Sequence, residues 1–449
     1  MTESADSSKP VFGLILMGGP LSGALVRDIR LANELVSRGF EVHVWWAMDQ
    51  GPEGMLDERI PQRWLFNAFR YYGWGRGAGS RAGRTMTRFF RHHNRSQVAQ
   101  NHPALMERLM QNMLRLVANG VENDMPIVNA FARDLSATKV THVLPMLSVL
   151  CPWVETARKQ VNHKVKYLVT FQGYELYINY ARRANLEAEL YREFSRVTDE
   201  SDFKAIAVSE DYRDRVEDDI GVSKEKIVAI PPGIPPAEPT DRQEQMKYLK
   251  EKLSTYQEGV PLVTFLGRRD SEKGIDLLLY AAAILKKRGV NFQLAICGPT
   301  LFGGHYSEVC EEIAENLRIN FINKRFIKNE IRNALFRASE CVVYPSIHRE
   351  PFGMVPVEAM SHGTPVVVPD SGGVASVIEA NGAVAGLRFR IWDSGDLADQ
   401  LARILQNQAV RNKLAEDAPK VADYFSVENL ANRVLDHIGV TPHAQSATD

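Results

Sequence analysis

Two glutamates in one short segment have a spacing that suits a single extended ligand. Glu350 and Glu358 lie eight residues apart within 341–368, which reads CVVYPSIHREPFGMVPVEAMSHGTPVVV. The apolar run 341–344 predicts a strand, and the residues after Glu350 predict a loop that opens into a helix. Eight residues span a little over two helical turns, which is too far for a tight acid–base pair of carboxylates. Because a carboxylate accepts from two hydroxyls at once, the spacing favours a ligand that carries a ribose or a hexose.

The start of this predicted helix is a candidate anion site. The backbone N–H groups of Phe352, Gly353 and Met354 would point at an anion bound there. The alternative is that the two glutamates are ordinary polar residues on a helix of an α/β protein. The flanking strands and the EPFG core favour ligand binding.

A second candidate site follows the apolar strand predicted over 260–266. The polar loop 268–273, RRDSEK, comes next, and a helix is predicted to begin at Ile275. A strand, basic loop and helix in this order commonly hold a diphosphate at the carboxyl ends of the strands. Arg268 can bind phosphate oxygens in a bidentate way, and Lys273 adds a point charge. We expect both on an exposed loop; the alternative is a solvated basic turn.

A glycine-containing loop, GGPLSG over 18–23, follows the first predicted strand, 11–17. It is not a GxGxxG motif, which argues against dinucleotide binding. Gly19, Ser22 and Gly23 are candidates for contacting a bound diphosphate through free N–H groups at a helix start. The alternative is that the glycines only allow a tight turn between strand and helix.

The two motifs together resemble those of retaining glycosyltransferases of family 4, the glycosyl transferases group 1, which have the GT-B fold. Segment 341–368 resembles the family's E-x7-E signature, and 267–276 its G-R-x(n)-K-G-(I/V)-D segment. The resemblance implies that Glu350 faces the donor sugar, that Arg268 and Lys273 hold the donor diphosphate, and that Glu358 binds the ribose. It assigns the remaining donor contacts of this loop to Phe352, Gly353, Met354 and Val355. It also implies that the positive residues replace a metal, so no cofactor and no metal are expected.

The chain departs from this family at VTFQGYELY, 169–177. Many relatives carry V-x-x-H-G-x-D here, whereas this chain has Gln172 for the histidine and Glu175 for the aspartate. Glutamine cannot titrate, so acid–base chemistry by histidine is excluded at this position. Gln172 and Glu175 stay candidates for contacting the acceptor; a different acceptor or lost activity are the alternatives.

The order of predicted elements indicates fold class and domains. Strands alternate with helices in two sets, which predicts an α/β GT-B fold of two Rossmann-like parallel-sheet domains facing an interdomain cleft. The Pro-rich stretch 231–240 is the expected linker. The predicted domains are an acceptor-side domain over 1–232 and a donor-binding domain over 241–425. A final helix and tail over 426–449 are predicted to cross back to the first domain.

Composition fits a globular enzyme. The chain has 449 residues, 45% hydrophobic and 24% charged, with a formal net charge of −1, so no basic field argues for nucleic acid. The four cysteines lack CxxC spacing and are expected to be buried free thiols of a reducing compartment. The polar N-terminus does not resemble a signal peptide, and no apolar run reaches the roughly 20 residues of a membrane span. The expected location is the cytoplasm, with peripheral membrane association left open.

An arginine-rich insertion is predicted over 59–106, where nine arginines stand with no lysine and no acidic residue. Arginine favours bidentate contacts with oxyanions. The segment is interpreted as a surface for an anionic acceptor or an anionic membrane, with a solvated insertion as the alternative and RNA disfavoured. The acceptor candidates in it are Arg84, Arg88 and Arg91.

We therefore predict a retaining, metal-independent hexosyltransferase that uses a nucleotide-diphosphate sugar and an acceptor hydroxyl. The acceptor would be a sugar phosphate, an acidic sugar or a lipid headgroup. A GT-B nucleotide-sugar epimerase and a non-catalytic GT-B binding protein are the alternatives. The sequence leaves the nucleobase, the sugar, the linkage and the oligomeric state open.

Overall fold

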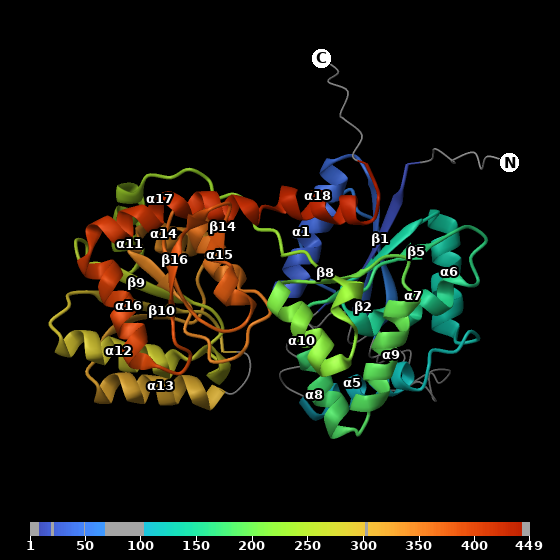
Figure 1. Cartoon of the computed structure of the whole chain (residues 1–449), viewed down its shortest axis with the longest axis horizontal. Helices are drawn as coiled ribbons and strands as arrows, with labels where there is room; N and C mark the ends of the chain where they lie inside the picture. The colour runs from blue at the N-terminus through green and yellow to red at the C-terminus, as the bar shows by residue number, and fades with distance from the viewer. Residues whose placement is uncertain (1–8, 19–21, 49, 68–102, 301–303, 442–449) are drawn as a thin grey trace, which may run out of the picture. The chain divides into compact units, whose positions relative to one another are not determined.

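The computed structural model describes residues 9–18, 22–48, 50–67, 103–300 and 304–441. The chain divides into two compact units: unit 1 comprises residues up to Gly233 and those from Leu430 onward, and unit 2 comprises Ile234–Asn429. Each unit is an α/β structure in which helices cover parallel strands (Figure 1).

Unit 1 contains a five-stranded sheet of order β3-β2-β1-β4-β5 and a three-stranded sheet of order β6-β7-β8. Strand β1 is central because its run VFGLILM is apolar on both faces, as parallel strands covered by helices require. Its register places Val11 opposite Glu41 and Phe12 opposite His142.

The strands of unit 1 are β1 (Val11–Met17), β2 (Glu41–Met48), β3 (Gln62–Asn67), β4 (His142–Pro145), β5 (Lys166–Tyr167), β6 (Thr170–Phe171), β7 (Ala205–Ala207) and β8 (Ile227–Ala229). Its helices are α1 (Gly23–Ser37), α5 (Pro103–Ala118), α6 (Pro126–Thr138), α7 (Cys151–Arg158), α8 (Glu175–Arg183), α9 (Glu187–Asp199) and α10 (Glu210–Ile220).

Two segments of unit 1 show how pairing divides the sequence. Residues 165–171 contain two short strands and not one, because β5 pairs with β4 whereas β6 pairs with β7 of the other sheet. The apolar residues of 165–171 are buried, but they do not pair along one continuous strand. Of the arginine-rich segment 59–106, residues 62–67 form β3 at the edge of the five-stranded sheet, and residues 103–106 begin α5. Residues 68–102 lie outside the described part of the chain.

Unit 2 contains a six-stranded parallel sheet of order β11-β10-β9-β12-β13-β16. Strand β9 is central and buried throughout. Figure 1 shows α12, α13 and α16 on one face of this sheet, and α11, α14, α15 and α17 on the other. The carboxyl ends of β9 and β12 are neighbours, since Cys341 pairs with Val263. The loops that follow these two strands are therefore placed side by side.

The strands of unit 2 are β9 (Leu262–Leu266), β10 (Gln293–Cys297), β11 (Phe321–Lys324), β12 (Cys341–Val343), β13 (Val366–Pro369), β14 (Glu379–Ala380), β15 (Ala383–Val384) and β16 (Gly386–Phe389). Its helices are α11 (Arg242–Lys252), α12 (Ile275–Lys287), α13 (Gly304–Asn316), α14 (Asn329–Ala338), α15 (Met354–Ser361), α16 (Ser394–Gln406) and α17 (Gln408–Tyr424).

The last helix, α18 (Val427–His437), begins in unit 2, and its residues from Leu430 onward belong to unit 1. In unit 1, Arg38 Nη1 donates to Asn432 Oδ1 at 2.6 Å. A second contact joins His437 Nε2 and the carbonyl oxygen of Lys204 at 2.7 Å. Among the described residues, no helix combines the length and the apolar character needed to cross a membrane.

Candidate functional site

The loops after β9 and β12 are joined along their backbones. The Ile347 N–H donates to the Glu272 carbonyl at 3.0 Å, and Ser346 Oγ lies 2.9 Å from the same carbonyl oxygen. Gly274 makes this approach possible: its φ is +62°, and a Cβ there would lie 2.1 Å from the Pro345 carbonyl oxygen. Only glycine fits without displacing that backbone. The two motifs recognised in the sequence thus meet in one place.

The centre of this place is an ion pair between Lys273 Nζ and Glu350 Oε1. The same carboxylate oxygen accepts from Ser346 Oγ at 2.8 Å, and Tyr344 OH lies 3.4 Å from Nζ. Lys273 is 7% exposed and Glu350 8% exposed. The expectation that Lys273 lies on an exposed loop is therefore wrong. The short turn Ser271–Lys273 brings its ammonium inward, where a carboxylate compensates for the lost hydration.

The surroundings keep this pair charged. Burial alone would raise the pKa of Glu350, but the charge and hydrogen bond of Lys273 and the hydrogen bond from Ser346 lower it overall. Burial alone would lower the pKa of Lys273, but Tyr344 and Glu350 raise it overall. Burial raises the pKa of Tyr344 to about 12, so its hydroxyl stays neutral near pH 7. The result is a buried, charged pair at the carboxyl ends of the strands.

Arg268 lies on the same loop, and its side chain is 32% exposed. Its Nη1 donates to Asp270 Oδ2 at 2.5 Å, and its Nη2 contacts Glu272 Oε1. Two carboxylates of its own loop therefore hold the guanidinium. A phosphate bound here would compete with them for the same N–H groups or use the exposed side of the guanidinium.

The loop from Glu350 to α15 is held from the far side by the segment after β13. The Gly373 N–H donates to the Glu350 carbonyl at 2.7 Å. Gly372, with φ +78°, lies so close that a Cβ would meet Glu350 N at 2.7 Å. This packing fixes the backbone of Glu350 and thereby the direction of its side chain.

The predicted donor contacts lie where α15 begins. Met354 and Val355 form its first turn and are half-buried; Gly353 precedes the helix. The Phe352 side chain is buried against Phe425 with ring centroids 5.4 Å apart, so only its backbone could serve a ligand. Glu358, in the second turn, is half-buried, and its Oε2 lies 3.8 Å from Arg332 Nη1.

In unit 1, two predicted residues of the first loop, Ser22 and Gly23, form the N-terminal end of α1. Ser22 is the N-cap and accepts from the Leu25 N–H at 3.3 Å, and Gly23 is the first helical residue. Capping of this kind satisfies a donor that the helix cannot. Gly19 lies outside the described residues, as do Arg84, Arg88 and Arg91.

The segment around Gln172 is bound into the interior of unit 1. Gln172 Nε2 donates to Asp28 Oδ2 and to the Met146 carbonyl, both at 2.7 Å. Both oxygens of Glu175 have partners within the unit, since Oε2 accepts from Tyr212 OH at 2.9 Å and Oε1 lies 2.5 Å from Arg215 Nη1. Glu175 thus supports the loop that carries Gln172.

Several of these partners were not predicted from the sequence: Tyr344, Ser346, Asp270, Glu272, Asp28 and Tyr212. Asp270 and Glu272 had a local signal, because they stand two and four residues after Arg268. Asp28 had one too: it interrupts the apolar face of α1, between the buried Leu25 and Ile29. No local sequence pattern distinguishes Tyr212 from an ordinary core tyrosine.

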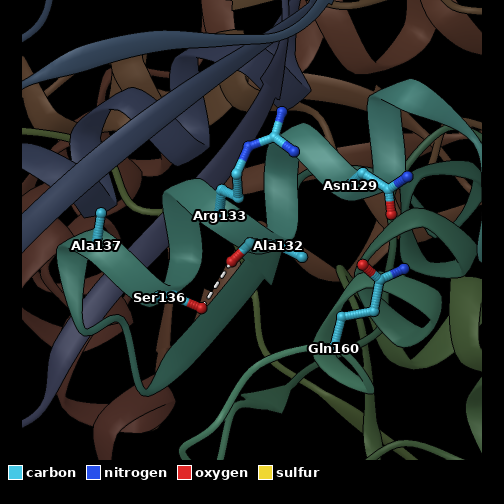
Figure 2. Close-up of a pocket in the computed structure, with 6 residues that line it drawn as sticks. All are labelled: Asn129, Ala132, Arg133, Ser136, Ala137 and Gln160. Atoms are coloured by element: carbon cyan, nitrogen blue, oxygen red, sulfur yellow. Dashed lines mark hydrogen bonds between the residues drawn. The ribbon is translucent and has the colours of Figure 1, made fainter.

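Other features lie apart from these residues. Figure 2 shows a pocket on α6 whose lining includes none of the predicted site residues. Its lining is Asn129, Ala132, Arg133, Ser136, Ala137 and Gln160.

The four cysteines are free and buried, as predicted. Burial raises the pKa of Cys297 to about 12 and that of Cys310 to about 11, which disfavours reactive thiolates. Within the described part of the chain, no group of three or more His, Cys, Asp or Glu side chains could hold a metal ion.

Comparison with known sequences finds that the chain is similar to glycosyltransferases. Residues 249–421 match the model of the family described as Glycosyl transferases group 1. The D-inositol 3-phosphate glycosyltransferase of Corynebacterium urealyticum is 35% identical over 188 residues, which is 40% of this chain and 43% of that protein. The uncharacterized glycosyltransferase MJ1607 of Methanocaldococcus jannaschii is 28% identical over 240 residues, 52% of this chain and 58% of that protein. The chain therefore spans about half the length of the curated relatives it matches.

Solved structures resemble the chain over nearly its whole length. Anabaena Alr3699/HepE, in complex with UDP and glucose, has a TM-score of 0.67 at 16% identity, covering 96% of this chain and 99% of that one. Sucrose-phosphate synthase (tll1590) from Thermosynechococcus elongatus has a TM-score of 0.67 at 18% identity, covering 95% and 98%. At such identities the likeness shows the fold, and the predicted α/β GT-B class with Rossmann-like parallel sheets is confirmed.

Proposed function

We propose that this protein is a retaining glycosyltransferase of family 4 that moves a hexosyl unit from a nucleotide-diphosphate sugar to an acceptor hydroxyl. The observation that carries the proposal is the buried Lys273–Glu350 pair, which lies beside Arg268 within the region that matches the glycosyltransferase family. A charged pair is costly to bury, so its position at the carboxyl ends of the strands is more readily explained by chemistry than by stability.

Each residue of the site has a separate proposed role. Arg268 offers the half-exposed guanidinium that binds diphosphate oxygens, and Lys273 adds a fixed positive charge that stabilises the leaving diphosphate. Glu350 keeps Lys273 in place and presents its carboxylate toward the donor sugar. Glu358 binds the ribose hydroxyls. These positive groups take the role of a metal, so transfer needs none.

The relatives suggest which donor and acceptor to test first. Alr3699/HepE has been solved with UDP and glucose, which makes UDP-glucose the first donor to test. Several relatives are D-inositol 3-phosphate glycosyltransferases, so a polyol phosphate is the first acceptor. An anionic acceptor also agrees with the arginine-rich sequence of 59–106. We propose a cytoplasmic location, with peripheral membrane binding if the acceptor is a lipid headgroup.

The test is a transfer assay with the full chain. Radiolabelled UDP-glucose, GDP-mannose and ADP-glucose are each incubated with 1D-myo-inositol 3-phosphate or without it, in the presence of EDTA. The expected result is a labelled product that needs both substrates, and whose anomeric configuration by NMR matches that of the donor. An inverted product or a dependence on added metal would contradict the mechanism.

The same assay separates the alternatives. A nucleotide-sugar epimerase would convert the labelled donor alone to its epimer, whereas a transferase leaves the sugar configuration of unreacted donor unchanged. A non-catalytic protein would bind UDP in calorimetry and produce no labelled product with any donor. Loss of transfer in Arg268→Ala would show that the activity belongs to this site and not to a contaminant.

A further inference from the structure

The amide of Gln172 is oriented by two acceptors. A glutamine amide can present either its oxygen or its NH2 group to a ligand, because the group can be turned over. Here Asp28 Oδ2 and the Met146 carbonyl oxygen each lie 2.7 Å from Nε2. Neither a carboxylate nor a carbonyl can donate a hydrogen bond. Both therefore require the NH2 group, and the amide oxygen is left on the other side.

Asp28 is fixed in turn. Its Oδ1 accepts from Arg27 Nη1 at 2.5 Å, so its two oxygens serve two different donors. Arg27, Asp28 and Gln172 are 2%, 3% and 6% exposed. An aspartate in this position can satisfy both neighbours at once, whereas an asparagine could offer an oxygen to only one of them. The two donors, Arg27 and Gln172, therefore explain why position 28 carries a carboxylate.

The backbone after Gln172 is held independently. Tyr212 OH accepts from the Gly173 N–H at 2.8 Å and from the Tyr174 N–H at 3.0 Å, and it donates to Glu175. Tyr212 is fully buried. The backbone that directly follows Gln172 is therefore held at two successive residues, which favours a preorganised binding group.

The amide lies where ligands of this fold class bind. Gln172 directly follows β6, and Met146 directly follows β4. The Met17 N–H at the end of β1 contacts Met146 Sδ at 3.4 Å. The amide therefore lies at the carboxyl ends of parallel strands, the usual location of ligand sites in open α/β sheets. Among the described residues, no donor makes a hydrogen bond to Gln172 Oε1.

We propose that Asp28 is a positioning residue that makes Gln172 present its amide oxygen to a hydroxyl of the acceptor substrate. This inference rests on the proposed glycosyltransferase function. At this position unit 1 offers a hydrogen-bond acceptor, so the ligand group must be a donor, such as a sugar or polyol hydroxyl. A carboxylate or phosphate oxygen of the ligand would be repelled at this position.

The first experiment does not depend on activity. The full chain is labelled with 15N-glutamine, and the Gln172 side-chain signal is assigned by its absence in Gln172→Met. The two Nε2 protons are expected to exchange slowly with water in the wild type, and at least about tenfold faster in Asp28→Asn, because one of two buried hydrogen bonds is lost. The matched control is Asp218→Asn, which changes an exposed aspartate of unit 1. Equal exchange in Asp28→Asn and in the control would overturn the positioning role.

A double-mutant cycle keeps the test valid if Asp28→Asn folds poorly. Gln172→Glu sets a carboxylate against Asp28 and should be strongly destabilised. In the double variant Asp28→Asn/Gln172→Glu, the introduced amide can donate to the introduced carboxylate while its oxygen still accepts from Arg27. The double variant is therefore expected to be more stable than Gln172→Glu alone. A double variant that is less stable than Gln172→Glu would overturn the arrangement.

The last experiment tests the ligand. With UDP-glucose and 1D-myo-inositol 3-phosphate as probes, Asp28→Asn should raise the acceptor KM about tenfold, the size of one hydrogen bond. The KM for UDP-glucose should change less than about twofold in this variant. An unchanged acceptor KM would overturn the proposed role toward the acceptor. Absence of any transfer by the wild type would instead contradict the proposed function, and the exchange measurement would then decide the positioning role.

Discussion

Lys273 and Glu350, which lie 77 residues apart in the sequence, form an ion pair inside unit 2. The pair joins the loop after β9 to the loop before α15. The two residues are therefore one electrostatic unit, and a substitution of either changes the environment of the other. Stability and activity must be measured together when this site is mutated.

Removing the ammonium of Lys273 is expected to destabilise unit 2. Lys273→Met fills a similar volume but leaves Glu350 buried without its counter-ion. Breaking a buried pair in this way typically costs about 3–5 kcal/mol. Urea unfolding of this variant should show such a loss, whereas Lys287→Met, which changes an exposed lysine of α12, should lose less than about 0.5 kcal/mol. Equal stability of the two variants would mean that the pair is not formed in solution.

The pair also predicts how stability depends on pH. The folded-state pKa of Glu350 lies below its ordinary value of 4.5. Its contribution to the free energy of unfolding is therefore complete above about pH 4.5 and is lost as the pH falls through the folded-state pKa. Glu350→Gln lacks this contribution, so its stability deficit relative to the wild type should shrink between pH 6 and pH 3. A deficit that stays constant over this range would show that Glu350 is not ionised in the folded protein.

Arg268 is expected to act on rate rather than on folding. Its side chain is half-exposed, and removal of one preorganised donor to developing charge typically costs about 2–4 kcal/mol of transition-state stabilisation, or two to three decades in kcat. Arg268→Ala should therefore lose transfer while keeping a thermal midpoint close to that of the wild type. Arg268→Lys should recover only part of the rate, since lysine cannot bind two oxygens in a bidentate way. Wild-type kcat in Arg268→Ala would refute the diphosphate assignment.

The sequence predicted the parts of the site that depend on local pattern. The apolar runs before Gly267 and before Tyr344 correctly predicted β9 and β12, and the loop after Glu350 does open into a helix. The parallel-sheet pattern predicts that the carboxyl ends of these strands share one edge, but that β9 and β12 are neighbours on it is known from the structure.

Long-range contacts could not be predicted in the same way. The burial of Lys273 depends on the close approach of Gly274 to Pro345, which no local pattern encodes. The partner of Gln172 is Asp28, 144 residues away. The split of 165–171 into β5 and β6 has the same origin, since each strand follows a different neighbour.

Glu358 is expected to govern nucleotide affinity. It lies in the second turn of α15, half-buried, where a carboxylate could accept from ribose hydroxyls. Glu358→Gln keeps the size of the side chain but removes the charge that strengthens such hydrogen bonds, which typically contribute about 1.5–3 kcal/mol. Calorimetry should therefore show UDP binding weakened by one to two decades, with kcat at saturating donor changed much less. Glu350→Gln should show the reverse, a lower kcat with UDP affinity nearly retained. UDP binding to Glu358→Gln as tight as to the wild type would contradict the ribose role.

The arginines of the segment 59–106 are expected to recruit an anionic acceptor. Replacing Arg84, Arg88 and Arg91 with alanine should raise the KM for 1D-myo-inositol 3-phosphate while leaving UDP affinity intact, because none of these three arginines is assigned a nucleotide contact. Added salt should weaken acceptor binding to the wild type more than to the triple variant, since exposed charges are screened within about 10 Å at 0.1 M salt. Flotation with vesicles of phosphatidylcholine, with and without phosphatidylinositol, separates a lipid acceptor from a soluble one. Unchanged acceptor kinetics together with no binding to anionic vesicles would leave the segment as a solvated insertion.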